Sequence, residues 1–428
     1  MSDASPTEAY PICQVRRISM LSSGGVWGND PDGLHDSLVV RSTDQTAEGQ
    51  WNRSSPATRS LSSQERSIPR LAAGDLVITK SSGSARHIGK TTIVDDSLAQ
   101  EGAYHGNFMQ RVRLRSTEWP RYFWYVFNSA FIRAQIALHS TSSTGLANLT
   151  GSTIGELKVP RPPLDEQRAI ADYLDRKTTS IDTLIEEQRR LIALLRERRQ
   201  SMIDYAILGS DSTDLALACS RNLERLDRLA TVLISTVDKH TSTDEHPVRL
   251  CNYMDVYTNS SITCYIEYMN ATATAKEIDK FQLRRGDTLL TKDSESPEDI
   301  GMTAYVDYQA SDLVCGYHLA ILRPALRDVD PAYLYWATTS RFVQRQWASL
   351  ARGVTRFGLR YGDIGKASIP MHEKGVQERV AGQLAERTAA IDELVAEAES
   401  FIELARERRS ALISAAVTGQ INVRDMAA

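Results

Sequence analysis

The chain has 428 residues, of which 42% are hydrophobic and 24% are charged. That length is more than one core usually supports, so we expect two or three folded domains, and the composition excludes a largely disordered chain. A formal net charge of −4 argues against a uniformly basic nucleic-acid binder but leaves room for local basic patches.

The sequence gives no indication of a membrane protein or of a protein from an oxidising compartment. No run approaches the roughly 18 apolar residues that a membrane helix needs, and the first eleven residues carry acids in place of a basic, apolar leader. The five cysteines are widely spaced and form no C-x-x-C pair. We therefore expect a cytoplasmic protein that has reduced thiols, binds no metal and contacts no membrane.

The first 160 residues read as a mixed domain of strands and helices. Gly74-Asp75 precedes an apolar run ending at Thr79-Lys80, which predicts a strand, a turn and a second strand. The string 83–91 resembles a phosphate-binding loop, but its first glycine lies one residue too far from Gly89-Lys90-Thr91, and strand-like residues follow where a helix is required. Further on, Pro120 opens an aromatic-rich segment that we expect to be helical.

Residues 161–221 are predicted to form a long helical arm. Apolar residues recur at alternating steps of three and four, the pattern of a helix with a seam that packs on a second helix. About 37 residues of this pattern would make a rod of roughly 55 Å. An ordinary core helix with a long exposed face is the alternative. The predicted seam comprises Leu174, Ile181, Leu184, Leu191 and Leu195, with Lys177 and Arg198 as polar interruptions.

The chain is an internal repeat. A shift of 210 residues aligns Leu164–Gly209 with Lys374–Gly419 without a gap, and 17 of these 46 positions are identical, including Gln167 with Gln377. Weaker matches precede each copy, such as Gly286-Asp287 for Gly74-Asp75 and Pro331 for Pro120. The second seam is predicted at Leu384, Ile391, Leu394, Phe401 and Leu412, with Arg387 and Arg408 as its polar sites.

This repeat predicts the order domain, arm, domain, arm, with boundaries 1–160, 161–221, 222–370 and 371–428. Because the first arm ends at the second domain and the second arm starts there, pairing the seams makes the arms antiparallel. We expect an α+β protein in which two mixed α/β domains are separated by two long antiparallel helices forming a coiled coil, with internal pseudo-two-fold symmetry. Each domain would then lie at one end of the paired arms.

Each domain contains one segment without acidic residues. Residues 119–155 and 331–362 lack Asp and Glu but contain arginines among aromatic and hydroxyl side chains. Phosphates need cations and hydrogen-bond donors nearby, so such segments suit a nucleic-acid surface, although most of the aromatics are expected to be core. With the turns after each Gly-Asp strand, they give the candidate DNA contacts Lys80, Ser82, Arg86, Lys90, Ser142, Thr144, Asn148, Lys292, Ser294, Arg352, Thr355, Arg356 and Arg360. For the turns, a plain solvated loop is the alternative.

Catalytic signatures are missing from the sequence. No G-x-G-x-x-G opens a strand-helix unit, and no Asn-Pro-Pro-aromatic run typical of amino-methyltransferases occurs. The acidic-x-Lys end of a nuclease metal site is absent after Asp75, since Ile78 lies two residues before Lys80. The eight histidines show no metal-ligand spacing. These absences favour a binding protein over a catalyst.

The repeated motifs resemble those of a known family. Val159 to Ala171, followed by Ile181-Asp182-x-Leu184 and Arg196-x-Arg198-Arg199, resembles the central repeat of the DNA-specificity subunit of type I restriction-modification enzymes, and Ile369 to Gly419 resembles its distal repeat. The resemblance covers essentially the whole chain. One departure is Gly375-Val376 in place of Asp165-Glu166 at the start of the second copy.

The resemblance implies a non-catalytic subunit that reads double-stranded DNA. In the family, each domain recognises one half of a split sequence, and the arms set the gap and dock two methyltransferase subunits, which restriction and translocase subunits join. S-adenosylmethionine and ATP would then be bound by partner chains, and this chain would need no cofactor. We expect an asymmetric target with two different halves.

Two other functions are open at this stage. A coiled-coil scaffold would use its domains to bind proteins rather than DNA, and a stand-alone nuclease or methyltransferase would turn over substrate by itself. Partner contacts are expected on arm surfaces outside the seam, with Glu187, Arg196 and Arg199 as candidates, a solvated helix surface being the alternative.

Overall fold

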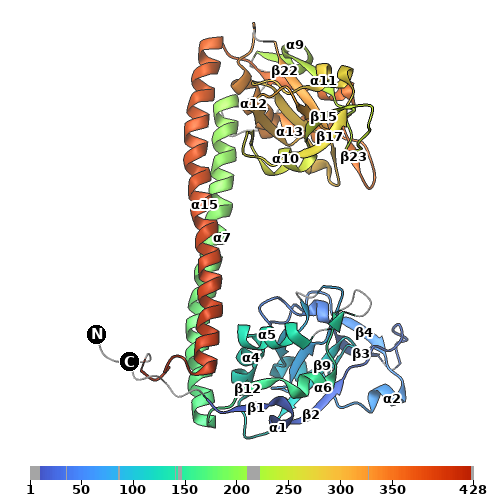
Figure 1. Cartoon of the computed structure of the whole chain (residues 1–428), viewed down its shortest axis with the longest axis vertical. Helices are drawn as coiled ribbons and strands as arrows, with labels where there is room; N and C mark the ends of the chain where they lie inside the picture. Colours follow the sequence, from blue (N-terminus) through green and yellow to red (C-terminus); the bar gives the residue numbers. More distant parts are fainter. Residues whose placement is uncertain are drawn as a thin grey trace. The chain divides into compact units, whose positions relative to one another are not determined.

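The protein is described by a computed structural model for residues 10–34, 36–84, 87–139, 141–142, 147–209, 222–325 and 327–425. It divides into two compact units, of which unit 1 comprises residues 1–188 and 400–428 and unit 2 comprises residues 189–399. Each unit contains one globular domain of strands and helices together with part of each of two long helices (Figure 1). The chain is thus a mixed helix and sheet protein, as predicted.

The first domain, in unit 1, is built on a four-stranded antiparallel sheet. Its order is β2 (Ser19–Gly24), β9 (Met109–Leu114), β5 (Leu76–Thr79) and β7 (Thr91–Ile93). A second sheet places β3 (Asp36–Val40) between antiparallel β4 (Ala57–Ser60) and parallel β8 (Tyr104–His105). Short pairings add β1 (Ile12–Gln14) with β12 (Lys158–Pro160), and β6 (Ser81–Ser82) with β11 (Ala147–Asn148) and β10 (Thr141–Ser142).

Helices cover the first domain's main sheet. Pro120 begins α4 (Pro120–Asn128), and residues 122–127 of this helix are all buried, so its aromatic side chains form core as expected. The other helical segments are α1 (Val15–Ile18), η1 (Ser42–Asp44), α2 (Ser63–Arg66), α3 (Asp96–Gln100), α5 (Ala130–His139) and α6 (Gly151–Glu156).

The second domain, in unit 2, repeats this plan. Its main sheet runs β14 (Ala230–Ile234), β22 (Leu319–Pro324), β18 (Thr288–Thr291), β20 (Thr303–Val306) and β16 (Ser261–Ile262). Its second sheet places β15 (His246–Cys251) between antiparallel β17 (Met269–Ala273) and parallel β21 (Leu313–Cys315). Short pairings join β13 (Leu223–Arg225) to β24 (Ser368–Pro370) and β19 (Asp293–Ser294) to β23 (Phe357–Gly358). The helical segments are α9 (Leu226–Leu229), α10 (Tyr253–Thr258), α11 (Ala275–Phe281), η3 (Pro297–Asp299), α12 (Pro331–Thr339), α13 (Arg341–Leu350) and α14 (Tyr361–Ile364).

The repeated Gly-Asp motif starts the central strand of both main sheets. Gly74 has a φ of +84°, a left-handed conformation that glycine adopts without strain, and Asp75 is buried. The Asp75 carboxylate pairs with Arg113 on the neighbouring strand at 2.6 Å, and Asp287 pairs with Arg323 at 2.7 Å in the second domain. The predicted strand, turn and strand are confirmed in both copies, and β7 excludes a phosphate-binding loop at Thr91.

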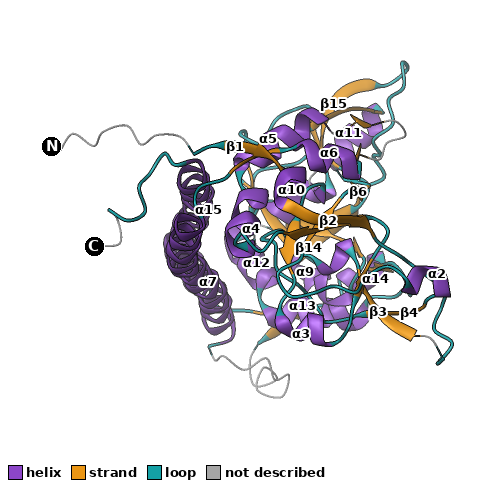
Figure 2. Ribbon diagram, turned by 90° about the horizontal axis from the view of Figure 1, so that it is seen from below, coloured by secondary structure: helices purple, strands orange, loops and turns teal. Residues whose placement is uncertain are grey.

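Two helices of 45 residues each, α7 (Leu164–Leu208) and α15 (Lys374–Thr418), contribute a part to each unit, and within each unit the two parts lie side by side (Figures 1 and 2). In unit 1, Asp182 forms an ion pair with Arg409 at 2.9 Å, and in unit 2, Arg199 forms one with Asp392, also at 2.9 Å. The partner's number falls as the residue number rises, so the helices are antiparallel. The repeat exchanges the two ion pairs, so each unit contains the equivalent contact between the helices.

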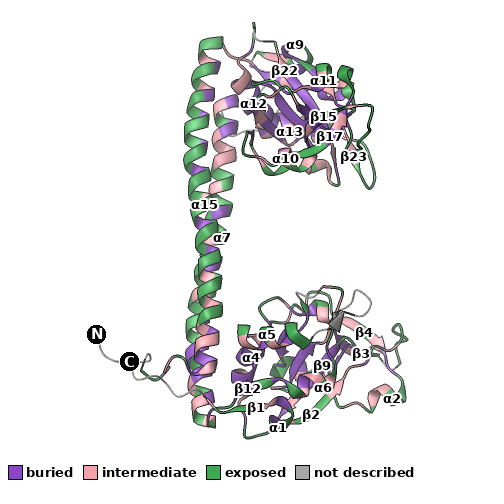
Figure 3. Cartoon of the chain, viewed as in Figure 1, coloured by how far each residue is buried: buried purple, intermediate pink, exposed green. Residues whose placement is uncertain are grey.

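The predicted seam is correct in part (Figure 3). Leu174, Leu384 and Ile391 are buried, while Ile181, Leu195 and Leu412 are half-buried. Four residues assigned to the seam are 42–49% exposed, and for them the prediction is wrong: Leu184, Leu191, Leu394 and Phe401.

The residues that form the seam lie one position after these four in the sequence. Ile185, Ile192 and Ile402 are buried, and steps of four and three from Leu174 reach the first two of them. After Ile181 the prediction takes the residue three positions on, Leu184, whereas the residue four positions on, Ile185, is the one that packs in the seam. For the same reason Thr178, Thr388, Arg199 and Arg409 are the polar seam residues, in place of the exposed Lys177, Arg387, Arg198 and Arg408.

The C-terminal segment completes the core of unit 1. Ile413, Val417 and Val423 belong to the same buried cluster as Leu174 and Tyr122. The Tyr122 hydroxyl donates a hydrogen bond to the Val417 carbonyl at 3.1 Å. Residues from both ends of the sequence therefore share one core. No described helix is long and apolar enough to cross a membrane.

Candidate DNA interface

Three short segments meet at one surface of the first domain. They are the turn after β5, the loop 106–108 between β8 and β9, and strand β11 from the acid-free segment. The backbone N–H groups of Lys80 and Ser81 donate to the Phe108 carbonyl at 2.9 and 3.2 Å, and the Leu149 N–H donates to the Lys80 carbonyl at 2.8 Å. Ser81 also pairs with Asn148 in the β6–β11 ladder. Backbone hydrogen bonds thus fix all three segments.

The second domain joins the equivalent three segments in the same way. The Lys292 N–H donates to the His318 carbonyl at 3.1 Å, and the Leu359 N–H donates to the Lys292 carbonyl at 2.8 Å. Asp293 pairs with Gly358 in the β19–β23 ladder. The backbone scheme is therefore duplicated, whereas the side chains that it presents differ between the domains.

The candidate residues of the first domain are only partly gathered here. Lys80 and Ser82 are half-buried at the turn, and Asn148 is exposed on β11. Lys90 is buried, and its ammonium donates to the carbonyls of Ser42 (3.2 Å) and Gln45 (2.9 Å), so it is not the exposed phosphate contact we expected. Arg86 and Thr144 lie outside the described residues, and only the backbone of Ser142 is described.

In the second domain the turn carries a chain of charged contacts. The Asp293 carboxylate contacts the Lys292 ammonium at 3.1 Å and His318 Nδ1 at 2.9 Å, and Arg356 lies 3.4 Å from the same nitrogen. Burial of Asp293 opposes its ionisation, but the contacts with His318 and Lys292 together hold its carboxyl pKa below the ordinary value. The acid is therefore balanced within the protein and does not leave an unpaired negative charge facing a phosphate.

The arginine-rich loop of the second domain is exposed. Arg352, Thr355, Arg356 and Arg360 all belong to the exposed class, on either side of β23. Ser294, by contrast, is only 6% exposed, so the structure does not favour the direct DNA contact predicted for it. The acid-free segment thus supplies core aromatics from α12 and α13 and cationic side chains from the loop that follows.

The loop between the two sheets was missed by the sequence analysis. It presents Phe108, 56% exposed, in the first domain and Tyr317, 50% exposed, in the second. Lys292 lies over the Tyr317 ring, 4.7 Å from its centroid. The internal repeat could have indicated this loop, because Gly106 and Gly316 align at the same shift of 210 residues and an aromatic residue follows each within two positions.

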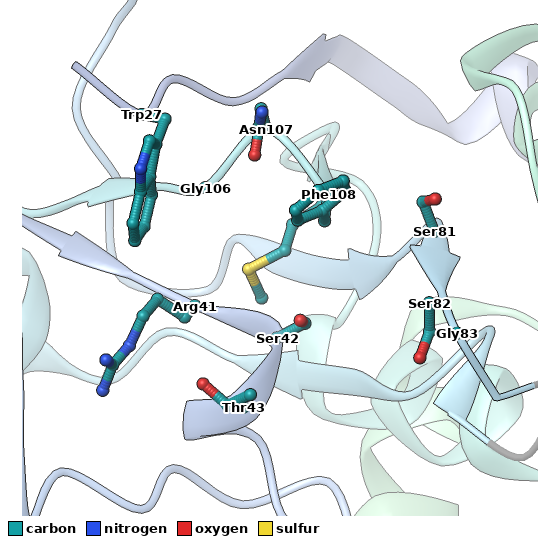
Figure 4. A pocket seen from close by; sticks show the side chains of 11 residues that line it. Trp27, Arg41, Ser42, Thr43, Ser81, Ser82, Gly83, Gly106, Asn107 and Phe108 are labelled. Atoms are coloured by element: carbon teal, nitrogen blue, oxygen red, sulfur yellow. The ribbon is translucent and has the colours of Figure 1, made fainter. Parts of the chain in front are cut away.

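A cavity of about 610 Å³ opens at this surface of the first domain (Figure 4). The rings of Trp27 and Phe108 line it together with hydroxyl groups from residues 42–43 and 81–82. The described residues around the cavity include no carboxylate. Among the described residues, no group of three His, Cys, Asp or Glu side chains is placed to hold a metal ion.

The candidate partner residues on the long helices have different environments. Glu187 is exposed, and Arg196 is 64% exposed at the side chain while pairing with Glu399 at 2.9 Å. Arg199 pairs with Asp392 and is only 18% exposed at the side chain, so its assignment to a surface outside the seam is wrong.

The exposed leucines of the helices form a duplicated apolar surface. Leu191 and Leu194 on α7 are 42% and 68% exposed, and their repeat counterparts on α15, Phe401 and Leu404, are 42% and 63% exposed. Each pair lies within one unit. Apolar side chains exposed at equivalent places in two copies favour a binding surface over chance exposure.

Known protein sequences match parts of this chain. A family model described as the type I restriction modification DNA specificity domain matches residues 62–193. The specificity subunit of the type I restriction enzyme StySPI from Salmonella potsdam is 27% identical over 146 residues, which are 34% of this chain and 31% of that protein. The EcoBI specificity subunit of Escherichia coli is 19% identical over 337 residues, 73% of this chain and 68% of the relative.

Two solved structures share the fold. A chain from a structure on complex assembly and conformational transition of the type I R-M system is 13% identical, with a TM-score of 0.66 and coverage of 97% of this chain and 100% of that one. The HsdS subunit from Thermoanaerobacter tengcongensis is also 13% identical, with a TM-score of 0.51 and coverage of 98% and 99%. With the duplicated order of domain and long helix, these matches show that the chain is similar to type I restriction-modification DNA-specificity subunits.

Proposed function

We propose that this chain is the sequence-reading subunit of a type I restriction-modification complex and has no catalytic centre of its own. Each domain would read one half of a bipartite target in double-stranded DNA. The duplicated three-segment surface carries the proposal, because one backbone scheme presents different side chains in the two copies. S-adenosylmethionine and ATP would be bound by partner chains.

The side chains at the two surfaces suit different half-sequences. The first domain offers hydroxyls at Ser81 and Ser82 and the Asn107 amide, groups that donate to or accept from base edges. The second offers Tyr317, His318 and cationic arginines. Because direct readout depends on the donors and acceptors presented, we expect an asymmetric target.

The helices α7 and α15 would dock the methyltransferase subunits, and restriction and translocase subunits would join that assembly. The duplicated apolar surface supports two methyltransferase subunits, one at Leu191 and Leu194 and the other at Phe401 and Leu404. The exposed Glu187 and Arg196 would lie at the polar rim of the first surface.

A domain exchange tests the reading function. The chain is co-expressed with a methyltransferase subunit, and modified DNA is sequenced to map the target. Replacing residues 1–160 with those of a homologue should change one half of the target, and replacing residues 222–370, the matched control, should change the other half.

Two outcomes would contradict the proposal. A change in both halves, or in neither, would show that the domains do not read independently. An assembled complex without any sequence-dependent retention of DNA would favour the coiled-coil scaffold, in which the domains bind proteins.

A further inference from the structure

The cavity of the first domain is built to receive a flat, mostly apolar group. The Trp27 and Phe108 rings come from different loops and both line it (Figure 4). Trp27 is held in place because Arg59 lies 4.7 Å from its ring centroid while the same guanidinium donates to the Trp27 carbonyl at 3.2 Å. Arg59 is fixed in turn by Asp30 at 2.7 Å. The Trp27 ring is therefore positioned before any ligand arrives.

Polar groups at the cavity's edge match the edge of a nucleobase. Ser42, Thr43, Ser82 and Asn107 line it and supply hydroxyl and amide groups that can both donate and accept hydrogen bonds. Arg41 also lines it, but its guanidinium is engaged by the Asp44 carboxylate at 2.7 Å. An apolar cavity with aromatic walls and a neutral polar rim fits a base better than a charged group.

A cationic cleft of about 460 Å³ adjoins the same two chain segments. It is lined by Ala47, Ser84, His87, Lys90 and Arg133, of which Ala47 and Ser84 follow closely in sequence on residues 41–43 and 81–83 of the cavity. Burial lowers the pKa of both Lys90 and Arg133, and Arg133 lowers that of Lys90 further. The described lining of the cleft includes no carboxylate, and because Lys90 is already bound to backbone carbonyls, Arg133 is the cation that suits the phosphate accompanying a base.

The second domain fills the equivalent position with its own side chain. Backbone hydrogen bonds align Ser42 with Tyr253, because the Gly106 N–H donates to the Val40 carbonyl and the Gly316 N–H donates to the Cys251 carbonyl. The Tyr253 ring stacks on Tyr257 with centroids 5.5 Å apart. The Tyr253 hydroxyl hydrogen-bonds Ser294, the residue of β19 that corresponds to Ser82 of β6. The small side chain of Ser42 therefore leaves room between these segments in the first domain.

We propose that the cavity between Trp27 and Phe108 receives one nucleobase rotated out of the target duplex, so that the first domain reads that base by enclosing it. This inference rests on the proposed function and adds a subsite to the surface of the first domain. An unstacked base would gain the faces of the two rings and the hydrogen-bonding groups of the rim. The half-sequence read by the first domain would contain one position recognised in this way.

Mismatch scanning with the methyltransferase-bound complex tests the inference. Once the target is mapped, duplexes carrying a single mismatch at each position of the first half-site are compared for affinity. A mismatch lowers the cost of extruding a base, so at one position binding should tighten about tenfold, whereas mismatches elsewhere should weaken it.

Variants assign that position to the cavity. Ser42→Tyr places in the cavity the side chain that the second domain uses, and Phe108→Ala removes one exposed wall, so each should abolish the gain. Tyr317→Ala, the matched control in the second domain, should keep it. A base rotated by the methyltransferase itself would remain sensitive to mismatch in all three variants.

The outcomes separate the two proposals. Sequence-specific binding with the same mismatch profile in the wild type and in both cavity variants would overturn the inference alone. A complex without sequence preference would overturn the proposed function and the inference together. Phe108→Ala, which alters a side chain 56% exposed, keeps the test decisive if Ser42→Tyr lowers the melting temperature.

Discussion

Gln167, at the start of α7, joins the first domain to its helix, and its removal should destabilise unit 1 strongly. The side chain is 1% exposed. Its oxygen accepts the Trp119 N–H at 2.8 Å, and its nitrogen donates to the Glu118 carboxylate at 3.0 Å and to the Pro162 carbonyl at 2.9 Å. Gln167→Ala would leave three buried partners without this side chain.

The structure gives the magnitude. Two neutral hydrogen bonds contribute about 1 kcal/mol each and one to a carboxylate about 1.5–3 kcal/mol, so Gln167→Ala should cost roughly 4 kcal/mol. The repeat provides the matched control, since Gln377 accepts the Asp330 N–H at 2.8 Å and donates to the His372 carbonyl at 2.8 Å but reaches no carboxylate. Gln377→Ala should cost about 2 kcal/mol.

Hydrogen exchange read by mass spectrometry measures each unit separately, which matters because two units need not unfold together. Gln167→Ala should accelerate exchange in peptides of unit 1 and Gln377→Ala in peptides of unit 2. The reasoning is refuted if Gln167→Ala costs less than about 1 kcal/mol or if the two variants cost the same, because the carboxylate contact would then contribute nothing.

Three further predictions follow from single features. Gly301 has a φ of +85°, and a Cβ there would lie 2.8 Å from a carbon of the buried Trp347 indole. Gly301→Ala should therefore lower the free energy of unfolding, measured by denaturant titration, by about 2–4 kcal/mol. The control Gly362→Ala, where a Cβ would have no neighbour within 4 Å, should be nearly neutral. Burial lowers the pKa of His105 from 6.5 to about 4. Between these pH values the unfolded state binds a proton that the folded state does not, so unit 1 should keep its full stability above pH 6.5 and lose up to about 3 kcal/mol as the pH falls to 4. His105→Gln should flatten this dependence of stability on pH, and an unchanged dependence would contradict the burial argument. Leu194→Glu and Leu404→Glu should each change stability by less than about 0.5 kcal/mol and remove one methyltransferase subunit in native mass spectrometry, both together removing two; full occupancy would rule out docking there.

The repeat made the architecture predictable from sequence because the identical residues hold domain and helix together. Gln167 and Gln377 make equivalent buried contacts, so their identity marks the same junction in both copies. The Gly-Asp motif likewise starts the central strand of each sheet. The function of such positions could be predicted from the sequence because the same residues recur in both copies of the repeat.

Two features were harder to predict from the sequence: which residues of the helices form the seam, and the part that the loop 106–108 plays in the candidate interface. Leu184 and Leu191 satisfy a helical repeat as well as Ile185 and Ile192 do, and only packing against α15 decides which series is buried. The loop at Phe108 reaches the interface through backbone hydrogen bonds from Lys80, a pairing that side-chain patterns do not reveal. Burial of Lys90 has the same origin, since its partners are carbonyl groups.

The shared core of unit 1 has a consequence for synthesis on the ribosome. Unit 2 is one continuous stretch, whereas the cluster around Tyr122 includes Val417 and Val423. The domain translated first therefore waits for residues 413–423 before its interior closes, while the domain translated second can finish earlier. A stop codon shortly before residue 413 would damage the N-terminal half more than the middle of the protein.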